Sequence, residues 1–246
     1  MIQERGFHRK ASFGVQTRGD SINRELMAAM RAANFDSLMF GIETAADNLM
    51  ELINKKETVQ ENIDAVKLAK EMGFTVEATF IYGFPTETFD DRFKALALSH
   101  ETGIDRARFN NATPYPGTEM YNMVKDKLNI EPGWINFSSA GAVTAGIRRK
   151  HSLPYFPEGC TANELEGTVL LANLLFYLNL KNLKKLFNTG QGGSGKWFEV
   201  SKKEMLSPRV LIQLLVLGGT VLLRTIYYIF SSSNCRKFFF KGIRIT

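Results

Sequence analysis

Three short stretches in the first half of the chain combine polar side chains with glycine or proline where an apolar run ends. In the first, Phe-Gly-Ile-Glu-Thr at 40–44, Lys55 follows Glu43 by twelve residues. The second, Phe-Ile-Tyr-Gly-Phe-Pro-Thr-Glu-Thr at 80–88, and the third, Asn-Ala-Thr-Pro-Tyr-Pro-Gly-Thr-Glu at 111–119, each lead into a helical pattern. Because α/β proteins bind ligands at the carboxyl ends of parallel strands, these stretches are candidates for a ligand site.

The same residues also have purely structural interpretations. Lys55 could be an exposed lysine at a helix end, where it would interact with the helix dipole. Glu43 could cap the helix that follows it, and Gly-Phe-Pro at 83–85 could be only a turn between a strand and a helix. Glu77 and Arg108 could form an ion pair that has structural value alone.

Short β-rich runs separated by helical patterns are the elements that must position these stretches. We predict strands at 11–16, 37–43, 75–82 and 106–110, and helices at 23–33, 46–53, 59–72 and 89–101. The third helix begins with a capping box, Thr58-x-x-Glu61. Strands separated by helices need crossover connections, which predict a parallel sheet, either doubly wound or rolled into a β/α barrel.

The alternation of side chains along the strands favours the barrel. One set of positions is apolar: Phe13, Val15, Leu38, Phe40, Ile42, Val76, Ala78, Phe80, Ala107 and Phe109. The other set is polar or mixed: Gln16, Arg18, Met39, Gly41, Glu43, Glu77, Thr79, Arg108 and Asn110. A doubly wound sheet buries both faces, and an ordinary closed barrel fills its interior with Val, Ile and Leu. We therefore predict an α/β partial barrel with helices outside and a polar, ligand-holding lumen; the alternative is a sheet with one face in water.

The remaining chain divides into a connecting segment and a helical appendage. We predict a barrel part at 1–128, an irregular segment at 129–160 and a basic helical appendage at 161–246, with a long helix at 161–186 and a flexible linker near 188–196. The apolar run 210–230 is long enough to span a bilayer, but Gln213, Thr220 and Arg224 fall on one helix face. We expect this helix to pack on the domain or to lie on a membrane, and spanning remains the minority alternative.

Charge and cysteine content narrow the class of protein. The 246 residues carry a net charge of +6, but from residue 147 onward 15 Lys and Arg face 5 Asp and Glu, which leaves −4 for residues 1–146. The basic half could be a solvated surface that favours solubility, or it could bind an anionic membrane surface or nucleic acid, and charge alone does not choose between these. Cys160 and Cys235 are too few for a metal framework, and we favour an unpaired cytoplasmic pair over a disulfide. No metal ligands and no catalytic residue stand out, since the three histidines are scattered.

Taken together, the motifs FGIET, NKKET, FIYGFPTET and TPYPGTEMY resemble the radical S-adenosylmethionine (radical SAM) superfamily, and more narrowly its branch that often carries an upstream cobalamin-binding domain. The resemblance runs in order and spacing from about residue 11 to residue 122. It implies the C-terminal part of a six-stranded partial barrel, four strands of which lie in this chain. The family's Cys-x3-Cys-x2-Cys loop, which holds a 4Fe-4S cluster, and its second-strand glycine motif have no match here.

The resemblance also implies roles for individual residues in binding S-adenosylmethionine. Lys55 would pair with the methionyl carboxylate, although Lys56 stands where the family commonly has glycine. Glu43 would hydrogen-bond the ribose or the amino-acid part. The remaining positions that match cofactor-binding positions of the family are Gln16, Arg18, Thr79, Ile81 and Asn110.

The leading hypothesis for function is a fragment of a radical SAM enzyme that, with its cluster segment, generates a 5′-deoxyadenosyl radical to modify or methylate an organic substrate. Its partners would be a small-molecule or lipid-like substrate and a reductant protein, and cobalamin would come from an upstream domain. A non-catalytic truncated remnant and an RNA-modifying radical SAM enzyme are the alternatives, and the second ranks below a membrane role because the basic region shows no RNA-binding fold.

Overall fold

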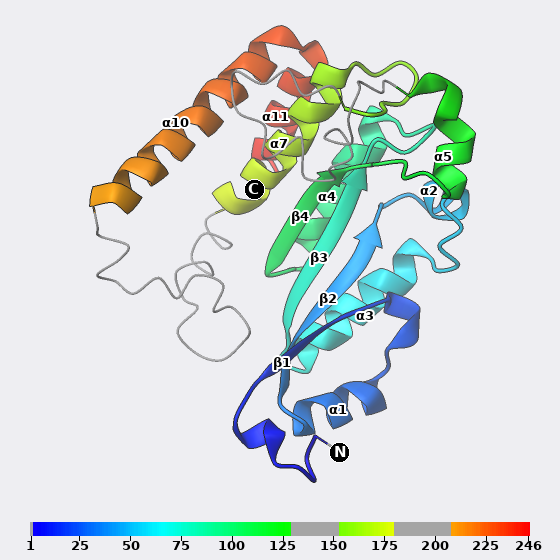
Figure 1. Cartoon of the computed structure of the whole chain (residues 1–246), viewed down its shortest axis with the longest axis vertical. Helices are drawn as coiled ribbons and strands as arrows, with labels where there is room; N and C mark the ends of the chain where they lie inside the picture. The colour runs from blue at the N-terminus through cyan, green and yellow to red at the C-terminus, as the bar shows by residue number, and fades with distance from the viewer. Residues whose placement is uncertain (1, 129–152, 180–207) are drawn as a thin grey trace.

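Four parallel strands lie side by side in sequence order in the computed structural model, which describes residues 2–128, 153–179 and 208–246 (Figure 1). They are β1 (Phe13–Thr17), β2 (Phe35–Glu43), β3 (Thr75–Tyr82) and β4 (Arg106–Asn111). All four predicted strands are confirmed; β1 begins two residues later and β2 two residues earlier than predicted. The parallel order confirms the α/β class and the crossover connections inferred from the sequence.

Helices cover one face of this sheet, as the partial barrel requires. The connecting helices α1 (Arg24–Ala32), α3 (Val59–Glu71) and α4 (Phe89–Glu101) lie on the same side in Figure 1. The predicted capping box of Thr58 and Glu61 begins α3, and a second one, of Thr88 and Asp91, begins α4. The apolar strand positions face these helices and are buried: Leu38, Phe40, Ile42, Val76, Ala78, Phe80, Ala107 and Phe109.

The opposite face of the sheet carries the polar set in rows fixed by the strand register. One row is Gln16, Met39, Glu77 and Arg106, and the next toward the carboxyl ends is Gly41, Thr79 and Arg108. Ile81 and Asn110 form the last row. We call this face, by those residues, the lumen face. The short helices α2 (Asp47–Leu52) and α5 (Glu119–Val124) lie beyond the carboxyl ends of the strands (Figure 1), and the 3-10 turns are Phe7–Arg9, Gly19–Ser21 and Lys125–Lys127.

A second group of helices packs at the β4 end of the sheet. It consists of α7 (Ala162–Leu178), α10 (Pro208–Ser231) and α11 (Ser233–Ile243). Of the predicted helix 161–186, α7 confirms the part up to Leu178; residues 180–186, the linker near 188–196 and most of the connecting segment (129–152) lie outside the described residues. No single helix in the described ranges is long and apolar enough to cross a membrane; the pair Leu215–Ser231 and Ser233–Ile243 reaches that length and composition together but is bent by 117°.

The outer edge of β4 is closed by side chains of α7. The Asn173 carboxamide accepts a hydrogen bond from the Phe109 amide (3.2 Å) and donates one to the Phe109 carbonyl (2.8 Å). One helical turn later, the Tyr177 hydroxyl donates to the Ala107 carbonyl (3.1 Å). These three bonds satisfy the backbone groups that a further strand would otherwise use, so α7 ends the sheet.

Replacing Asn173 with leucine should therefore destabilise the fold strongly. The Phe109 amide and carbonyl would both lose their partners, and each unsatisfied buried group costs about 1–3 kcal/mol. We expect the free energy of unfolding in urea to fall by about 2–4 kcal/mol. Tyr177→Phe is the matched control, since it removes one bond and should cost about 1 kcal/mol. Equal losses for the two variants would show that the Asn173 carboxamide does not hold this edge.

Candidate functional site

Glu43 lies at the centre of a tight turn at the carboxyl end of β2. The register of β2 with β3 shifts between Gly41 and Glu43, and the Thr44 amide donates to the Ile42 carbonyl (2.8 Å). The φ angle of Glu43 is +67°, a backbone conformation that residues other than glycine rarely adopt. This geometry is that of a γ-turn, which is uncommon and strained. Glu43 does not cap the next helix, because Ala46 is the N-cap of α2 and no side chain caps it.

The turn folds the Glu43 carboxylate back over Gly41. A Cβ atom added to Gly41 would lie 2.6 Å from Glu43 Oε1 and 3.9 Å from Lys55 Nζ. Two charged groups twelve residues apart in sequence thus converge on a strand position that has no side chain. Lys55 is not an exposed helix-end lysine, since α2 ends at Leu52 and the Lys55 side chain is 11% exposed.

Glu57, which the motif analysis missed, positions Lys55. Its buried carboxylate pairs through Oε1 with Lys55 Nζ (2.8 Å) and accepts through Oε2 from the backbone amides of Gly19 (3.1 Å) and Asp20 (3.4 Å). The carboxylate therefore ties the loop after α2 to the loop after β1. No periodic pattern in the sequence predicts this contact, because Lys56, which lies between Lys55 and Glu57, has a left-handed backbone with a φ angle of +48°.

Arg18 supports the same loop from outside the lumen. Its guanidinium forms a bidentate pair with Asp20 (2.7 and 2.9 Å) and donates to the Lys55 carbonyl (2.9 Å). The pKa of Arg18 is raised by the hydrogen bond from its side chain to Asp20. With these partners, Arg18 holds the backbone that carries Lys55, while Gln16, Thr79, Ile81 and Asn110 lie on the lumen face itself.

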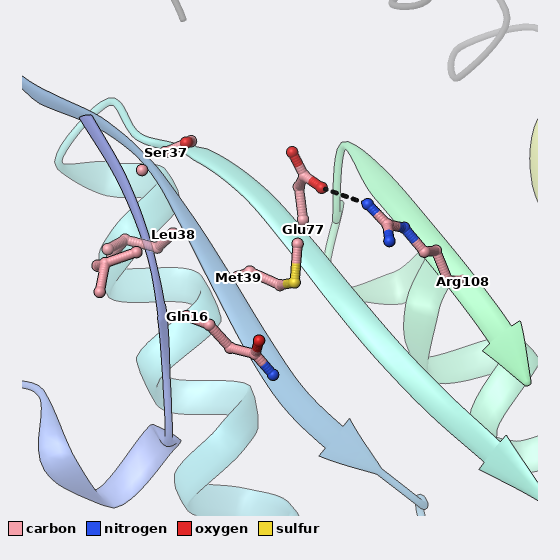
Figure 2. Close-up of a pocket in the computed structure, with 8 residues that line it drawn as sticks. Gln16, Ser37, Leu38, Met39, Glu77 and Arg108 are labelled. Atoms are coloured by element: carbon pink, nitrogen blue, oxygen red, sulfur yellow. Dashed lines mark ion pairs between the residues drawn. The ribbon is translucent and has the colours of Figure 1, made fainter. Parts of the chain in front are cut away.

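A hollow of about 260 Å³ opens on the lumen face one row before Gly41. Figure 2 shows Gln16, Met39, Glu77 and Arg108 around it. The predicted Glu77–Arg108 ion pair is present at 3.8 Å, but Arg106 is the nearer partner of Glu77, at 2.6 Å. The Arg108 side chain is 59% exposed and stands at the rim of the hollow. The hollow thus lies next to the Glu43–Lys55 site: Arg108, which lines the hollow, and Gly41, over which the site lies, belong to the same row of the sheet.

Burial sets the electrostatics of Glu43. Loss of water around the carboxyl group raises its pKa, the Lys55 ammonium lowers it, and the Glu57 carboxylate raises it again. The net direction is upward, so the Glu43 carboxyl is partly protonated at a higher pH than an exposed glutamate. A group in this state can accept a hydrogen bond from a ligand or donate one to it.

The second stretch, 80–88, joins the sheet to α7. Gly83 has a φ angle of +98°, and its amide donates to Glu87 Oε2 (2.6 Å). Glu87 pairs with the buried Arg92 guanidinium (3.3 Å), which also contacts Glu164 (3.7 Å). Gly83 and Glu87 therefore have the structural role that the turn interpretation gave this stretch, and that role extends to α7. The third stretch, 111–119, forms a loop whose Thr118 side chain caps α5.

The described residues contain no group of three or more His, Cys, Asp and Glu side chains that could hold a metal ion. Cys160 and Cys235 are both buried free thiols. Burial raises the pKa of each thiol to about 11, which keeps both protonated at neutral pH. Two cysteines cannot supply the three thiolates of an iron–sulfur cluster loop, so the residues of this chain do not fit such a cluster.

Comparisons with known proteins give a consistent picture. Residues 1–105 match the profile of the Radical SAM superfamily. A protein of Pyrococcus horikoshii described as an uncharacterized methyltransferase is 31% identical over 175 residues, which are 71% of this chain and 36% of that protein. The anaerobic magnesium-protoporphyrin IX monomethyl ester cyclase of Cereibacter sphaeroides is 28% identical over 193 residues, 78% of this chain and 29% of the cyclase. The chain thus spans about a third of the length of these curated relatives.

Solved structures of related enzymes superpose only in part. That of TsrM, a radical S-adenosylmethionine methyltransferase from Kitasatospora setae with cobalamin and a 4Fe-4S cluster bound, is 14% identical. The superposition covers 68% of this chain and 33% of the TsrM chain, with a TM-score of 0.45. A superposition this partial carries no detail of the site.

The buried Glu87 carboxyl predicts a pH dependence of stability. Burial raises its pKa from 4.5 to about 8, against the opposing effect of Arg92. The folded state therefore holds a proton that the unfolded chain has released, and stability falls as pH rises from about 5 to about 8. Glu87→Gln keeps an acceptor for the Gly83 amide but cannot titrate. We expect the urea midpoint of the parent chain to fall more steeply over this pH range than that of the variant, and parallel pH profiles would contradict this assignment.

Proposed function

Residues 1–105 belong to the radical SAM superfamily, and from this premise we propose that the lumen face binds S-adenosylmethionine as part of a radical SAM enzyme that modifies or methylates an organic substrate. The observation that carries the proposal is the convergence of Glu43 and Lys55 over Gly41. Both residues match family motifs, and the contacts described above give each a fixed place at the carboxyl end of β2.

The charges at this place suit an amino acid that carries a sulfonium. S-adenosylmethionine brings one carboxylate and two positive groups, and the site offers one ammonium and two buried carboxyl groups. In the proposal, Lys55 binds the methionyl carboxylate while Glu57 holds the ammonium in position. Glu43 accepts a hydrogen bond from the amino group or the ribose, and the missing Cβ of Gly41 leaves room for the Glu43 carboxylate to lie over the strand.

Other residues on the lumen face would contact the rest of the ligand. Thr79, Ile81 and Asn110 lie one strand or two away from Gly41 and would meet the ribose and adenine. The hollow near Gln16 would take the organic substrate, since it lies directly below the row of Gly41. The substrate class in this proposal is a small organic or lipid-like molecule, and the second partner is a protein that supplies electrons.

Cleavage of S-adenosylmethionine in this superfamily relies on the electron that an iron–sulfur cluster supplies. The two buried thiols of this chain do not fit that group, so the part assigned here to the chain is binding and orientation. Methylation with cobalamin remains an expectation from the motif resemblance.

Gly41→Ala gives the sharpest test of S-adenosylmethionine binding. The added methyl would displace the Glu43 carboxylate, which is the flexible end of a side chain, and leave the backbone in place. We expect affinity measured by calorimetry to fall about tenfold or more for Gly41→Ala and for Glu43→Ala. Lys55→Ala should be made with Glu57→Gln, because a lone buried carboxylate would destabilise the fold.

Two controls separate binding from folding. Glu71→Ala removes an exposed carboxylate outside the barrel and should leave affinity unchanged. Phe40→Ala empties a fully buried position on the helix side and should lower stability by about 3–5 kcal/mol. Unchanged affinity in the Gly41 and Glu43 variants, with the parent chain binding measurably, would remove these residues from the site.

We also expect this chain by itself to perform no radical chemistry. After anaerobic incubation with iron and sulfide and removal of the excess, the 246-residue chain should remain colourless, because its two cysteines are buried and protonated. With dithionite and S-adenosylmethionine, it should release no 5′-deoxyadenosine. Detection of this product from the chain alone would overturn the proposal that the chain binds S-adenosylmethionine without cleaving it.

A further inference from the structure

Helix α10 lies at the periphery of the molecule (Figure 1). Many of its large apolar side chains are exposed. Leu215 is 75% exposed and Phe230 is 78% exposed. Between these two, the exposed large apolar side chains are Val216, Leu217, Leu222, Leu223, Ile226 and Tyr227. A continuous surface of this kind is typical of an interaction site, since single exposed apolar residues are ordinary but gathered ones are not. We call these eight residues the α10 apolar surface.

The second half of the helix is fixed to the domain on the side opposite seven of these residues; Leu217, seven residues before Arg224, falls on the fixed side but in the first half of the helix. Arg224, Thr225 and Tyr228 are buried on the fixed side. The Tyr228 hydroxyl donates to Glu166 of α7 (2.9 Å), and the Arg224 guanidinium donates to the Tyr228 oxygen (3.5 Å). Because these polar contacts hold one side of α10 against α7, the helix presents its apolar surface outward in one orientation.

The segment of chain that carries this surface is basic. From residue 205 to the end of the chain there are six arginines and lysines and no aspartate or glutamate. Exposed basic side chains follow at Arg236, Lys237 and Lys241 of α11 and at Arg244 just after it, together with the exposed apolar Phe240 and Ile243. Lys241 pairs with Asp90 of α4 (3.4 Å), so the excess of positive charge rests on the other three. An apolar surface accompanied by an excess of basic residues complements a membrane that carries anionic lipids, which offers hydrocarbon and negative charge together.

We propose that the α10 apolar surface docks this chain on the surface of an anionic membrane, with α10 lying in the plane of the interface. This goes beyond the proposed binding of S-adenosylmethionine, which involves the lumen face. Two features oppose a spanning arrangement: the 117° bend between α10 and α11, and the buried contacts of Arg224, Tyr228 and Glu166, which insertion would break. An acidic protein surface could match the charge, but it would not match eight exposed apolar side chains along one helix as a bilayer does.

Sedimentation with vesicles tests this proposal on the 246-residue chain. We expect the parent chain to sediment with vesicles of phosphatidylcholine and phosphatidylglycerol, and much less with phosphatidylcholine alone. Leu215→Glu and Phe230→Glu should each weaken binding about tenfold or more, because each removes one large apolar side chain from the lipid and adds a repelled charge. The matched control is Leu26→Glu, at a 45% exposed leucine on α1, which should bind as the parent does.

Circular dichroism should show the same helix content for all three variants, since each replaces an exposed side chain. The proposal fails if the parent chain stays in solution with anionic vesicles, or if Leu215→Glu and Phe230→Glu bind as well as the parent. Resistance of the bound chain to alkaline carbonate would overturn the in-plane arrangement in favour of a span. Loss of a dimer in light scattering for these variants, without any vesicle effect, would assign the surface to a second copy of the chain.

Discussion

The buried guanidinium of Arg92 connects the two halves of this molecule. It pairs with Glu87 in the loop between β3 and α4 and with Glu164 at the start of α7, and it donates to Thr168 one turn later. The carbonyl of Arg92 accepts the Tyr82 hydroxyl, so the same residue also holds β3 against α4. A buried arginine is tolerated only where its donors find partners, and here the partners come from the sheet and from α7. The placement of α7, and through it of α10 and α11, depends on this cluster.

The barrel part of the fold was predictable from local sequence because its signals are local. Capping boxes, alternation along strands and glycine after helices act over a few residues, and all four strands were found. The helical appendage was harder, because α7 is apolar around most of its circumference and its partners are more than sixty residues away along the chain. Asn173 is hydrogen-bonded to Phe109, and Tyr228 to Glu166. No local sequence pattern predicts either pair.

The candidate site shows the same division between near and distant contacts. The motif match identified Glu43 and Lys55, but alternation alone would have placed Glu43 as an ordinary strand residue on the lumen face. The register shift after Gly41 and the turn at Glu43 depend on how β2 meets β3, which is a tertiary property. The role of Glu57 could not be predicted for a similar reason: its carboxylate accepts hydrogen bonds from two backbone amides that lie 37 and 38 residues earlier in the chain.

The carboxamide of Asn173 takes the place of a peptide group of a neighbouring strand, and this limits where the sheet can be extended. At the β4 edge the places of a neighbouring strand are taken by side chains of α7. Among the described residues, β1 has a hydrogen-bonded strand on one side only. Growth of the sheet is therefore directional: a strand supplied by another part of a polypeptide, or by another chain, can join only beside β1, and the lumen face would then lengthen from the side of Gln16.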